Sequence, residues 1–266
     1  MYDTKNTRIS LGVLVELNEG LREYRDSYVL VGGWAPYFIT RGHFDHCGSL
    51  DIDLVLRPEI FRKYETILGV VTAISFLPTA NPFKFKRNIT ADFGIELDFL
   101  TEPEALTSFP QEFTKIQDDL TAVIIPGSSL AFQFSFEAEF SGKLLDGSEL
   151  STQMKVADIV SMVGLKGHAL GRILKLEKDC YDLYAICGFT AGNPTKAADE
   201  FRLRFKPGNV NEETFIEEAL RRIGDYFRSE NGRGPLAVSR FYGTDEARRV
   251  DSYQRLNTFL KSVQQY

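Results

Sequence analysis

The stretch VGGWAPYFITRGHFDHCGSLDIDLVLRP, residues 31–58, contains the two features that decide our interpretation of the fold. A Gly-Gly pair, Gly32 and Gly33, follows the short apolar run YVLV and precedes a segment that we expect to be helical. Further on, Asp51 and Asp53 interrupt the apolar run LDIDLVL. Side chains two residues apart project from the same face of a β-strand, so the two carboxylates are predicted to point the same way.

Two neighbouring carboxylates repel each other unless a cation lies between them. Mg²⁺ or Mn²⁺ binds carboxylate and phosphate oxygens together and supports phosphoryl and nucleotidyl transfer. A later run, residues 95–100, alternates apolar and acidic side chains and offers Glu96 and Asp98 on one face. We therefore predict a metal site on Asp51, Asp53 and one of these two carboxylates; the alternative is an amphipathic strand with a solvated acidic face.

Two further features favour a phosphate ligand. Gly32 and Gly33, between a strand and a helix, present bare backbone amides at a helix N-terminus, where anions bind readily. Ser49 lies just before the acidic strand, where its hydroxyl can reach a phosphate. A simple turn is the alternative for the glycine pair.

The pattern of expected helices and strands divides the chain into two parts. An α/β domain over residues 1–150 combines expected helices with expected strands, and a helical domain over residues 151–266 follows it. Expected helices cover residues 9–24, 34–40 and 58–74, and expected strands cover 28–31, 50–56, 83–86, 95–100 and much of 120–154. Phe132, Phe134 and Phe136 are expected to alternate along one strand face as core residues.

Composition places the chain among soluble globular proteins, with 266 residues of which 43% are hydrophobic. No apolar run approaches the roughly 20 residues that span a bilayer, and the N-terminus does not resemble a signal peptide. The three cysteines are scattered, which argues against a disulfide framework. These features predict a cytoplasmic protein without a membrane partner.

Charge is distributed unevenly. Residues 201–266 carry 12 Lys and Arg against 9 Asp and Glu, whereas the whole chain has a net charge of −6. A basic C-terminal third is compatible with an RNA partner, and a solvated helical surface is the alternative. The basic side chains in question are Arg202, Arg204, Lys206, Arg221, Arg222, Arg248 and Arg249.

The order GGW, a spacer, DIDL and a further acidic strand resembles the nucleotidyltransferase superfamily that includes DNA polymerase β. The resemblance implies a nucleotidyltransferase fold of α+β class, with a mixed β-sheet flanked by helices and followed by a helical C-terminal domain. It implies that Asp51, Asp53 and Asp98 are the catalytic, metal-binding carboxylates, with Glu96 as the alternative for the third. In that family the third carboxylate activates the attacking hydroxyl of the acceptor.

A second motif, VGLKGHALGRILKLEKDCYDL at residues 163–183, resembles the helical motif of AbiEii-type nucleotidyltransferases, the toxins of type IV toxin–antitoxin systems. The resemblance implies that Lys166 binds the nucleotide triphosphate and that Asp182 supports the site. Arg172 and Asp179 are expected to pair and orient the helices. It also implies an NTP substrate, an RNA or tRNA acceptor and a possible antitoxin protein partner.

Other interpretations remain open. The GGWA opening also resembles aminoglycoside and lincosamide nucleotidyltransferases, although HFDHCGSLD departs from the Arg and His that those enzymes carry before the acidic pair. Transfer to a small molecule or to a protein side chain is one alternative, and an inactive nucleotidyltransferase-like binding domain is another. His43, His46 and Cys47 lack a second ligand pair for zinc, so we interpret this segment as a polar loop.

Overall fold

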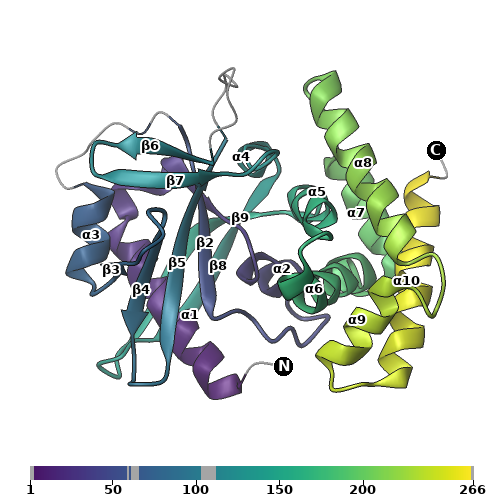
Figure 1. Cartoon of the computed structure of the whole chain (residues 1–266), viewed down its shortest axis with the longest axis horizontal. Coiled ribbons are helices and arrows are strands. Elements are labelled where there is room, and N and C mark those ends of the chain that lie inside the picture. Colours follow the sequence, from purple (N-terminus) through teal and green to yellow (C-terminus); the bar gives the residue numbers. More distant parts are fainter. Residues whose placement is uncertain (1–2, 59, 61–65, 103–111, 265–266) are drawn as a thin grey trace. The chain divides into compact units, whose positions relative to one another are not determined.

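The computed structural model describes residues 3–58, 60, 66–102 and 112–264, which form two compact units (Figure 1). We call residues 3–35 and 47–157 the sheet unit, and residues 36–46 and 158–264 the helical unit. The division expected at residue 150 falls inside the last strand of the sheet unit, Glu149–Ala157.

One mixed sheet organises the sheet unit. Within the described residues it has nine strands in the order β3-β4-β5-β2-β1-β9-β8, with β7 also pairing β5 and with β6 pairing β7. The strands are β1 (Tyr28–Leu30), β2 (Asp51–Leu56), β3 (Leu77–Pro78), β4 (Lys84–Asn88), β5 (Gly94–Thr101), β6 (Phe113–Gln117), β7 (Leu120–Ile124), β8 (Ser135–Lys143) and β9 (Glu149–Ala157). β2 runs parallel to β5 and antiparallel to β1, so the acidic strand lies inside the sheet rather than at its edge.

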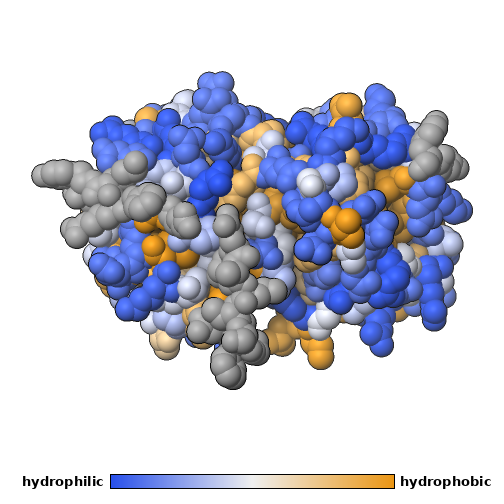
Figure 2. Space-filling model, turned by 90° about the horizontal axis from the view of Figure 1, so that it is seen from above, coloured by the Kyte–Doolittle hydropathy of each residue, from blue (hydrophilic) through white to orange (hydrophobic). Residues whose placement is uncertain are grey.

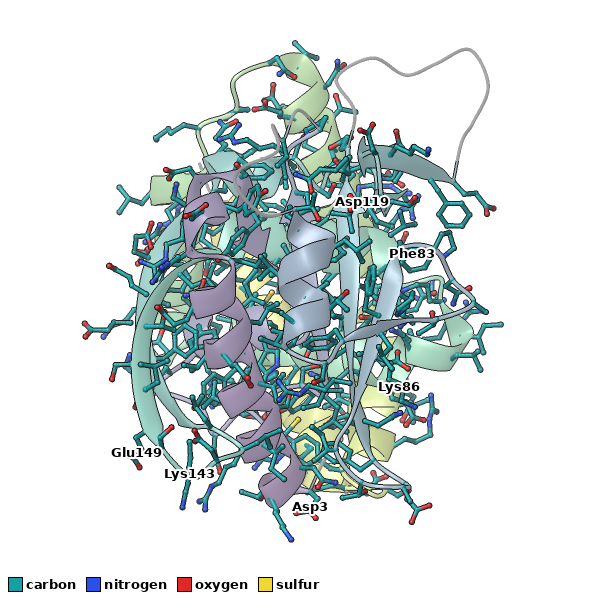
Figure 3. All side chains as sticks on the ribbon, turned by 90° about the vertical axis from the view of Figure 1, so that its left-hand side faces the viewer. Asp3, Phe83, Lys86, Asp119, Lys143 and Glu149 are labelled. Carbon is teal, nitrogen blue, oxygen red and sulfur yellow. The ribbon has the colours of Figure 1, made fainter. Side chains whose placement is uncertain are left out.

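The acidic side chains project from the sheet face that α1 (Thr4–Gly20) does not cover. α1 packs against β8 and β9, and α3 (Ile67–Ala73) lies beside it (Figure 3). Glu16 of α1 accepts a 2.6 Å hydrogen bond from Arg87 of β4, which identifies the face that α1 covers. Side chains alternate along β4, so Lys84 projects from the opposite face. A short helix, η1 (Arg22–Ser27), leads from α1 into β1, and α2 (Trp34–Ile39) follows the glycine pair.

Two segments of the sheet unit differ from the sequence prediction. The helix expected from Pro58 begins at Ile67, because Thr66 has extended backbone and its hydroxyl accepts the N–H of Gly69 as an N-cap; residues 59 and 61–65 lie outside the described part. The strand expected through Phe132 is instead the helix α4 (Leu130–Gln133), and β8 starts only at Ser135.

Glu102 explains the helical turn of α4. Its carboxylate accepts hydrogen bonds from the backbone N–H groups of Gly127 and Ser129, at 2.8 and 3.1 Å, where the chain turns into α4. Of the three phenylalanines expected to alternate as core residues, Phe134 is buried, whereas Phe132 is half-buried beneath the guanidinium of Arg57. The expected alternation is therefore wrong at the start of this segment.

The helical unit is built around α5 (Ile159–Ala169), which packs against α6 (Leu176–Phe189) and α8 (Val210–Tyr226). Its other helices are η2 (Ile173–Lys175), η3 (Thr190–Gly192), α7 (Pro194–Arg204), α9 (Arg233–Phe241) and α10 (Glu246–Gln264). Polar N-caps start two of these helices: Asp158 accepts the N–H groups of Val160 and Ser161 at the start of α5, and Asn193 caps α7.

The observed architecture confirms the predicted class, which is α+β with a mixed sheet flanked by helices and a helical C-terminal region. Hydrophilic side chains cover most of the face seen in Figure 2. Among the described helices, none has both the length and the apolar character that a bilayer-spanning segment requires.

Candidate active site

The carboxylates predicted to act together lie side by side on the sheet. In the parallel pairing of β2 with β5, Asp51 is opposite Glu96 and Asp53 is opposite Asp98. Neighbouring strands lie about 4.8 Å apart, so the four side chains form one acidic face, which we call the carboxylate face. The alternating positions, Ile52 among them, are fully buried on the other side. The structure therefore brings Asp51, Asp53 and both candidates for the third carboxylate together.

Gly32 lies directly against one of these carboxylates. A Cβ atom built on Gly32 would lie 1.8 Å from Asp53 Oδ2, and the backbone φ of Gly32 is +64°, in the left-handed region. The N–H of Val31 also donates a 3.0 Å hydrogen bond to the carbonyl of Asp53. Any side chain at position 32 would displace the Asp53 carboxylate, so this glycine is required by close approach as well as by backbone conformation.

Gly33 directly follows Gly32, and Ser49 lies two residues before Asp51. Both residues are buried. The Ser49 hydroxyl accepts a 3.2 Å hydrogen bond from the backbone N–H of Asp51, so it fixes the start of the acidic strand. The helix after the glycine pair, Trp34–Ile39, has only six residues. The roles of Gly32, Gly33 and Ser49 in binding phosphate stay predictions.

Lys84 is a residue of the carboxylate face that the sequence reasoning missed. Its ammonium lies 2.5 Å from Glu96 Oε2 and 3.0 Å from Asp98 Oδ1. Burial lowers the pKa of Lys84, but the hydrogen bonds to Glu96 and Asp98 raise it more, so the net pKa lies above its ordinary value. Lys84 is therefore cationic wherever the two carboxylates are ionised. The alternation KFK at residues 84–86 is the one sequence signal, since it predicts two lysines on one strand face.

Part of the carboxylate face supplies a donor set that suits a hard divalent cation. Asp51 and Asp53 supply carboxylate oxygens, the ligands that Mg²⁺ and Mn²⁺ prefer, from one strand. Asp98, expected as a third ligand, is paired with Lys84. The described part of the chain contains no group of three or more His, Cys, Asp or Glu side chains arranged to hold a metal ion. The Asp51–Asp53 pair supplies ligands that suit the predicted ion, and binding of that ion by Asp51, Asp53 and Asp98 together stays a prediction.

The residues of the second motif form a buried charge cluster in the helical unit. Lys166 of α5 donates to Asp179 Oδ1 at 2.8 Å and lies 2.7 Å from Asp182 Oδ2, both on α6. Burial alone lowers the pKa of Lys166, but the two carboxylates raise it more, so the side chain stays protonated. Burial raises the pKa of Asp182, while Lys166 and Lys178 lower it by more. The predicted binding of a triphosphate by Lys166 stays a prediction, because its ammonium is engaged by aspartates.

Arg172 and Asp179 pair as expected. Arg172 Nη2 donates to both carboxylate oxygens of Asp179, at 2.9 and 2.8 Å. The motif is not one continuous helix, however. α5 ends at Ala169 and α6 begins at Leu176, with the short helix η2 between them. Gly171 follows the end of α5, where a weak helix former favours such a break.

His46 is the second residue whose role the sequence reasoning missed. Its Nε2 lies 3.0 Å from Asp182 Oδ1, and neither side chain is exposed. Burial and the nearby Lys178 ammonium lower the pKa of His46 to about 4, despite the hydrogen bond to Asp182. A neutral imidazole must donate its Nε2–H to the carboxylate, since an ionised carboxylate only accepts. The segment is a loop, as interpreted from the sequence, but the His46 side chain is buried in it and paired with Asp182.

The basic side chains of the C-terminal third are largely paired with acids. Arg221 and Arg222 both contact Glu218, at 2.8 and 2.7 Å. Arg202, Arg204 and Arg249 form ion pairs with Asp199, Glu200 and Glu246 within their own helices. Arg248 donates to the hydroxyl of Tyr184 at 3.1 Å. This pattern favours the solvated helical surface over a surface dedicated to RNA phosphates.

Comparison with known proteins identifies no relative: no family model, no curated protein and no solved structure matches the chain.

Proposed function

We propose that this chain is a metal-dependent nucleotidyltransferase that moves a nucleotide from an NTP to a hydroxyl group of an acceptor. The observation that carries the proposal is the strand register, which places Asp53 opposite Asp98 with Asp51 on the same face. Lys84 offsets part of the repulsion among the four carboxylates of this face, and a bound divalent cation would offset more of it. The contact of Gly32 with Asp53 supports the same assignment, because it fixes one carboxylate against a bare backbone.

Each residue has a defined task in the proposed reaction. Asp51 and Asp53 hold Mg²⁺ or Mn²⁺, which supplies positive charge for the phosphates of the NTP when it is bound. Asp98 accepts the proton of the attacking hydroxyl. A bond forms between the acceptor oxygen and the α-phosphorus as the bond from that phosphorus to the bridging oxygen breaks, and pyrophosphate leaves. Catalysis rests on positioning and charge neutralisation, without a covalent enzyme intermediate.

RNA, with tRNA as the first candidate, is the acceptor that the resemblance to AbiEii-type toxins favours. The ion-paired arginines of the helical unit do not add to this preference. A small hydroxylated molecule and a protein side chain remain the alternative acceptors, and an antitoxin partner belongs to the same proposal. Lys166 and Asp182, which contact each other at 2.7 Å, keep in this proposal the nucleotide-binding roles that the resemblance to AbiEii-type toxins implies.

A transfer assay tests the activity and the acceptor together. The full chain, Mg²⁺ and each NTP labelled at the α-phosphate are incubated separately with total RNA, with a pool of small hydroxylated molecules and with a pool of proteins. We expect label on RNA of tRNA size, and none with the variant Asp51→Asn/Asp53→Asn. Label on a small molecule or on a protein would identify a different acceptor and would still support nucleotidyl transfer. Binding of NTP without transfer to any pool favours the inactive binding domain.

A further inference from the structure

A stacked pair of phenylalanine rings lies close to the carboxylate face. Phe113, the first residue of β6, packs its ring against that of Phe83, with 5.4 Å between the ring centroids and 20° between the ring planes. Phe83, which is labelled in Figure 3, belongs to the turn that leads into β4. Phe113 is still 37% exposed. Phe83 therefore supports the Phe113 ring on one side, while part of that ring stays accessible.

The strand register places Phe113 on the same sheet face as the carboxylates. Phe113 is opposite Val123 of β7, and Val123 is opposite Leu100 of β5. Directly opposed residues project from the same face of a sheet, and Leu100 shares its face with Asp98, two residues earlier. Two residues along β5 and two strand spacings across separate Asp98 from Phe113, or about 12 Å between their Cα atoms.

Phe83 is connected to the same carboxylate through its own neighbours. Its carbonyl oxygen accepts the N–H of Phe99 at 3.0 Å, and the next residue in the chain, Lys84, contacts Asp98 Oδ1 at 3.0 Å. Both connections place the ring pair within the reach of a single nucleotide whose phosphates lie at the carboxylates.

We propose that Phe113, supported by Phe83, stacks against the base of the NTP while the phosphates of the NTP lie at the carboxylate face. Aromatic side chains stack on bases of every kind, because every base has a π-face. The inference rests on the proposed function, because the NTP belongs to that proposal. Phe113 contacts the base, and Phe83 is a positioning residue that fixes the orientation of the Phe113 ring.

Stacking makes a contribution to NTP binding that can be separated from that of the phosphates. Tripolyphosphate has the phosphate chain of an NTP but no base, so its binding is expected to be independent of Phe113. Phe113→Leu keeps an apolar side chain and removes the aromatic face. We expect this variant to bind NTPs about tenfold more weakly, with all four bases, and to bind tripolyphosphate with unchanged affinity. Phe113→Trp keeps an aromatic face and should retain NTP binding.

The test is calorimetric titration of the full chain in Mg²⁺ with tripolyphosphate and with NTP analogues. In these analogues a methylene group replaces the oxygen between the α- and β-phosphorus atoms, which prevents transfer. Phe83→Leu should weaken analogue binding by less than Phe113→Leu does, and the double variant should be no weaker than Phe113→Leu alone. Leu145→Ala is the control, since it removes a 49% exposed apolar side chain between β8 and β9, at the other edge of the sheet. It should change neither affinity.

The outcomes separate the inference from the proposed function. Unchanged analogue binding in Phe113→Leu, or an equal loss of analogue and tripolyphosphate binding, contradicts base stacking and leaves the proposed function intact. Unchanged analogue binding with weaker tRNA binding would assign the ring pair to the acceptor and would also overturn the inference. Absence of binding of both ligands to the wild-type chain overturns the inference together with the proposed nucleotide site.

A second measurement on the wild-type chain applies if Phe113→Leu does not fold. An NTP with a photoreactive azido group on its base is bound in Mg²⁺ and irradiated, and the labelled peptide is identified by mass spectrometry. We expect label on the peptide that contains Phe113 or on the one that contains Phe83. Label on other peptides alone would contradict the inference.

Discussion

A glycine is required at position 32 for two reasons, its positive φ and its close approach to Asp53, and their effects can be measured separately. Gly32→Ala places a methyl group where the Asp53 carboxylate lies and also forces a side chain into a positive φ. We expect a loss of about 1–2 kcal/mol in the free energy of unfolding from the backbone, together with loss of Mn²⁺ binding from displacement of Asp53. Urea denaturation and Mn²⁺ titration of the same preparation measure the two effects.

Gly243→Ala is the matched control for that variant. Gly243 has a φ of +76°, and a Cβ atom there would meet nothing within 4 Å. Its substitution should lower stability by a similar amount and leave Mn²⁺ binding unchanged. Equal loss of Mn²⁺ binding in both variants would mean that Gly32 acts through general stability rather than through Asp53.

His46 predicts a pH dependence of stability with a defined sign. The unfolded imidazole takes up a proton near pH 6.5, whereas the folded one takes it up only near pH 4. The free energy of unfolding is therefore highest above pH 6.5 and decreases as the pH falls through this window, by on the order of 3 kcal/mol. Urea denaturation between pH 4 and pH 7 measures this decrease.

His46→Gln isolates the contribution of this side chain. The glutamine amide can still donate a hydrogen bond to Asp182 but does not titrate. We expect the variant to lose the stability change between about pH 6.5 and pH 4, while changes from carboxylates remain below it. Identical pH profiles of variant and wild type would contradict the assignment of a neutral, buried His46.

Single residues differ in how far the sequence predicts them. Asp51 and Asp53 were predictable because strand alternation is local, and the pairing of Arg172 with Asp179 is confirmed. The contacts of Lys84 were missed because they depend on the pairing register of two consecutive strands, β4 and β5, which places Lys84 opposite Asp98. His46 was missed for a different reason, because its partner lies 136 residues away.

At the scale of elements, the contact of α5 with α8 depends on small residues, and Gly167 is the one that approaches the α8 backbone. A Cβ atom on Gly167 would lie 2.7–2.9 Å from the Cβ, Cα and carbonyl oxygen of Ala219. In an exposed helix a change from Gly to Ala is stabilising. Here we expect Gly167→Ala to lower the free energy of unfolding by about 1–3 kcal/mol, because backbone atoms of α8 must shift. Urea denaturation measures the difference.

Gly171 is the control for this prediction. It follows the end of α5, and a Cβ atom there would meet nothing within 4 Å. Gly171→Ala should be neutral or slightly stabilising. A stabilising effect of Gly167→Ala would show that α5 and α8 are not in close contact.

Element boundaries were predicted less well than element types. The strands around residues 51–56 and 95–100 follow from two-residue alternation, and the C-terminal helices from their apolar periodicity. The start of α3 at Ile67 and the helical turn of α4 depend instead on side-chain caps. The Thr66 hydroxyl caps α3, and the carboxylate of the distant Glu102 accepts the N–H groups of Gly127 and Ser129 before α4. Such local caps override a pattern that looks continuous in the sequence.

At the scale of the whole molecule, the predicted surface for RNA is open to a direct test. Glu218 accepts ion pairs from Arg221 and Arg222, which hold its pKa at about 2. If the acceptor RNA contacts α8, Glu218→Gln should tighten tRNA binding severalfold at low salt, because Arg222 loses its acidic partner and Arg221 keeps only its pair with Asp225. The gain should decrease as salt is raised.

Glu217→Gln on the same helix removes an equal charge from an exposed position next to Glu218. Equal changes in the two variants would indicate a general charge effect. No change in either, measured by filter binding across a salt series, would show that α8 does not contact RNA and would favour the other acceptors.

The coarse architecture followed from the sequence, whereas the activity rests on the arrangement of a few side chains. The α+β class is confirmed, and the register of β2 with β5 brings together carboxylates that lie more than forty residues apart in the chain. The central claim is that this carboxylate face performs nucleotidyl transfer.

The most direct test of that claim is the initial rate of pyrophosphate release from NTP by the full chain in Mg²⁺, with total RNA present. We predict that Asp53→Asn lowers the rate by at least about a hundredfold, and that Glu149→Gln, which neutralises an exposed carboxylate on β9, leaves it unchanged. Full pyrophosphate release by the Asp53→Asn chain would contradict the account.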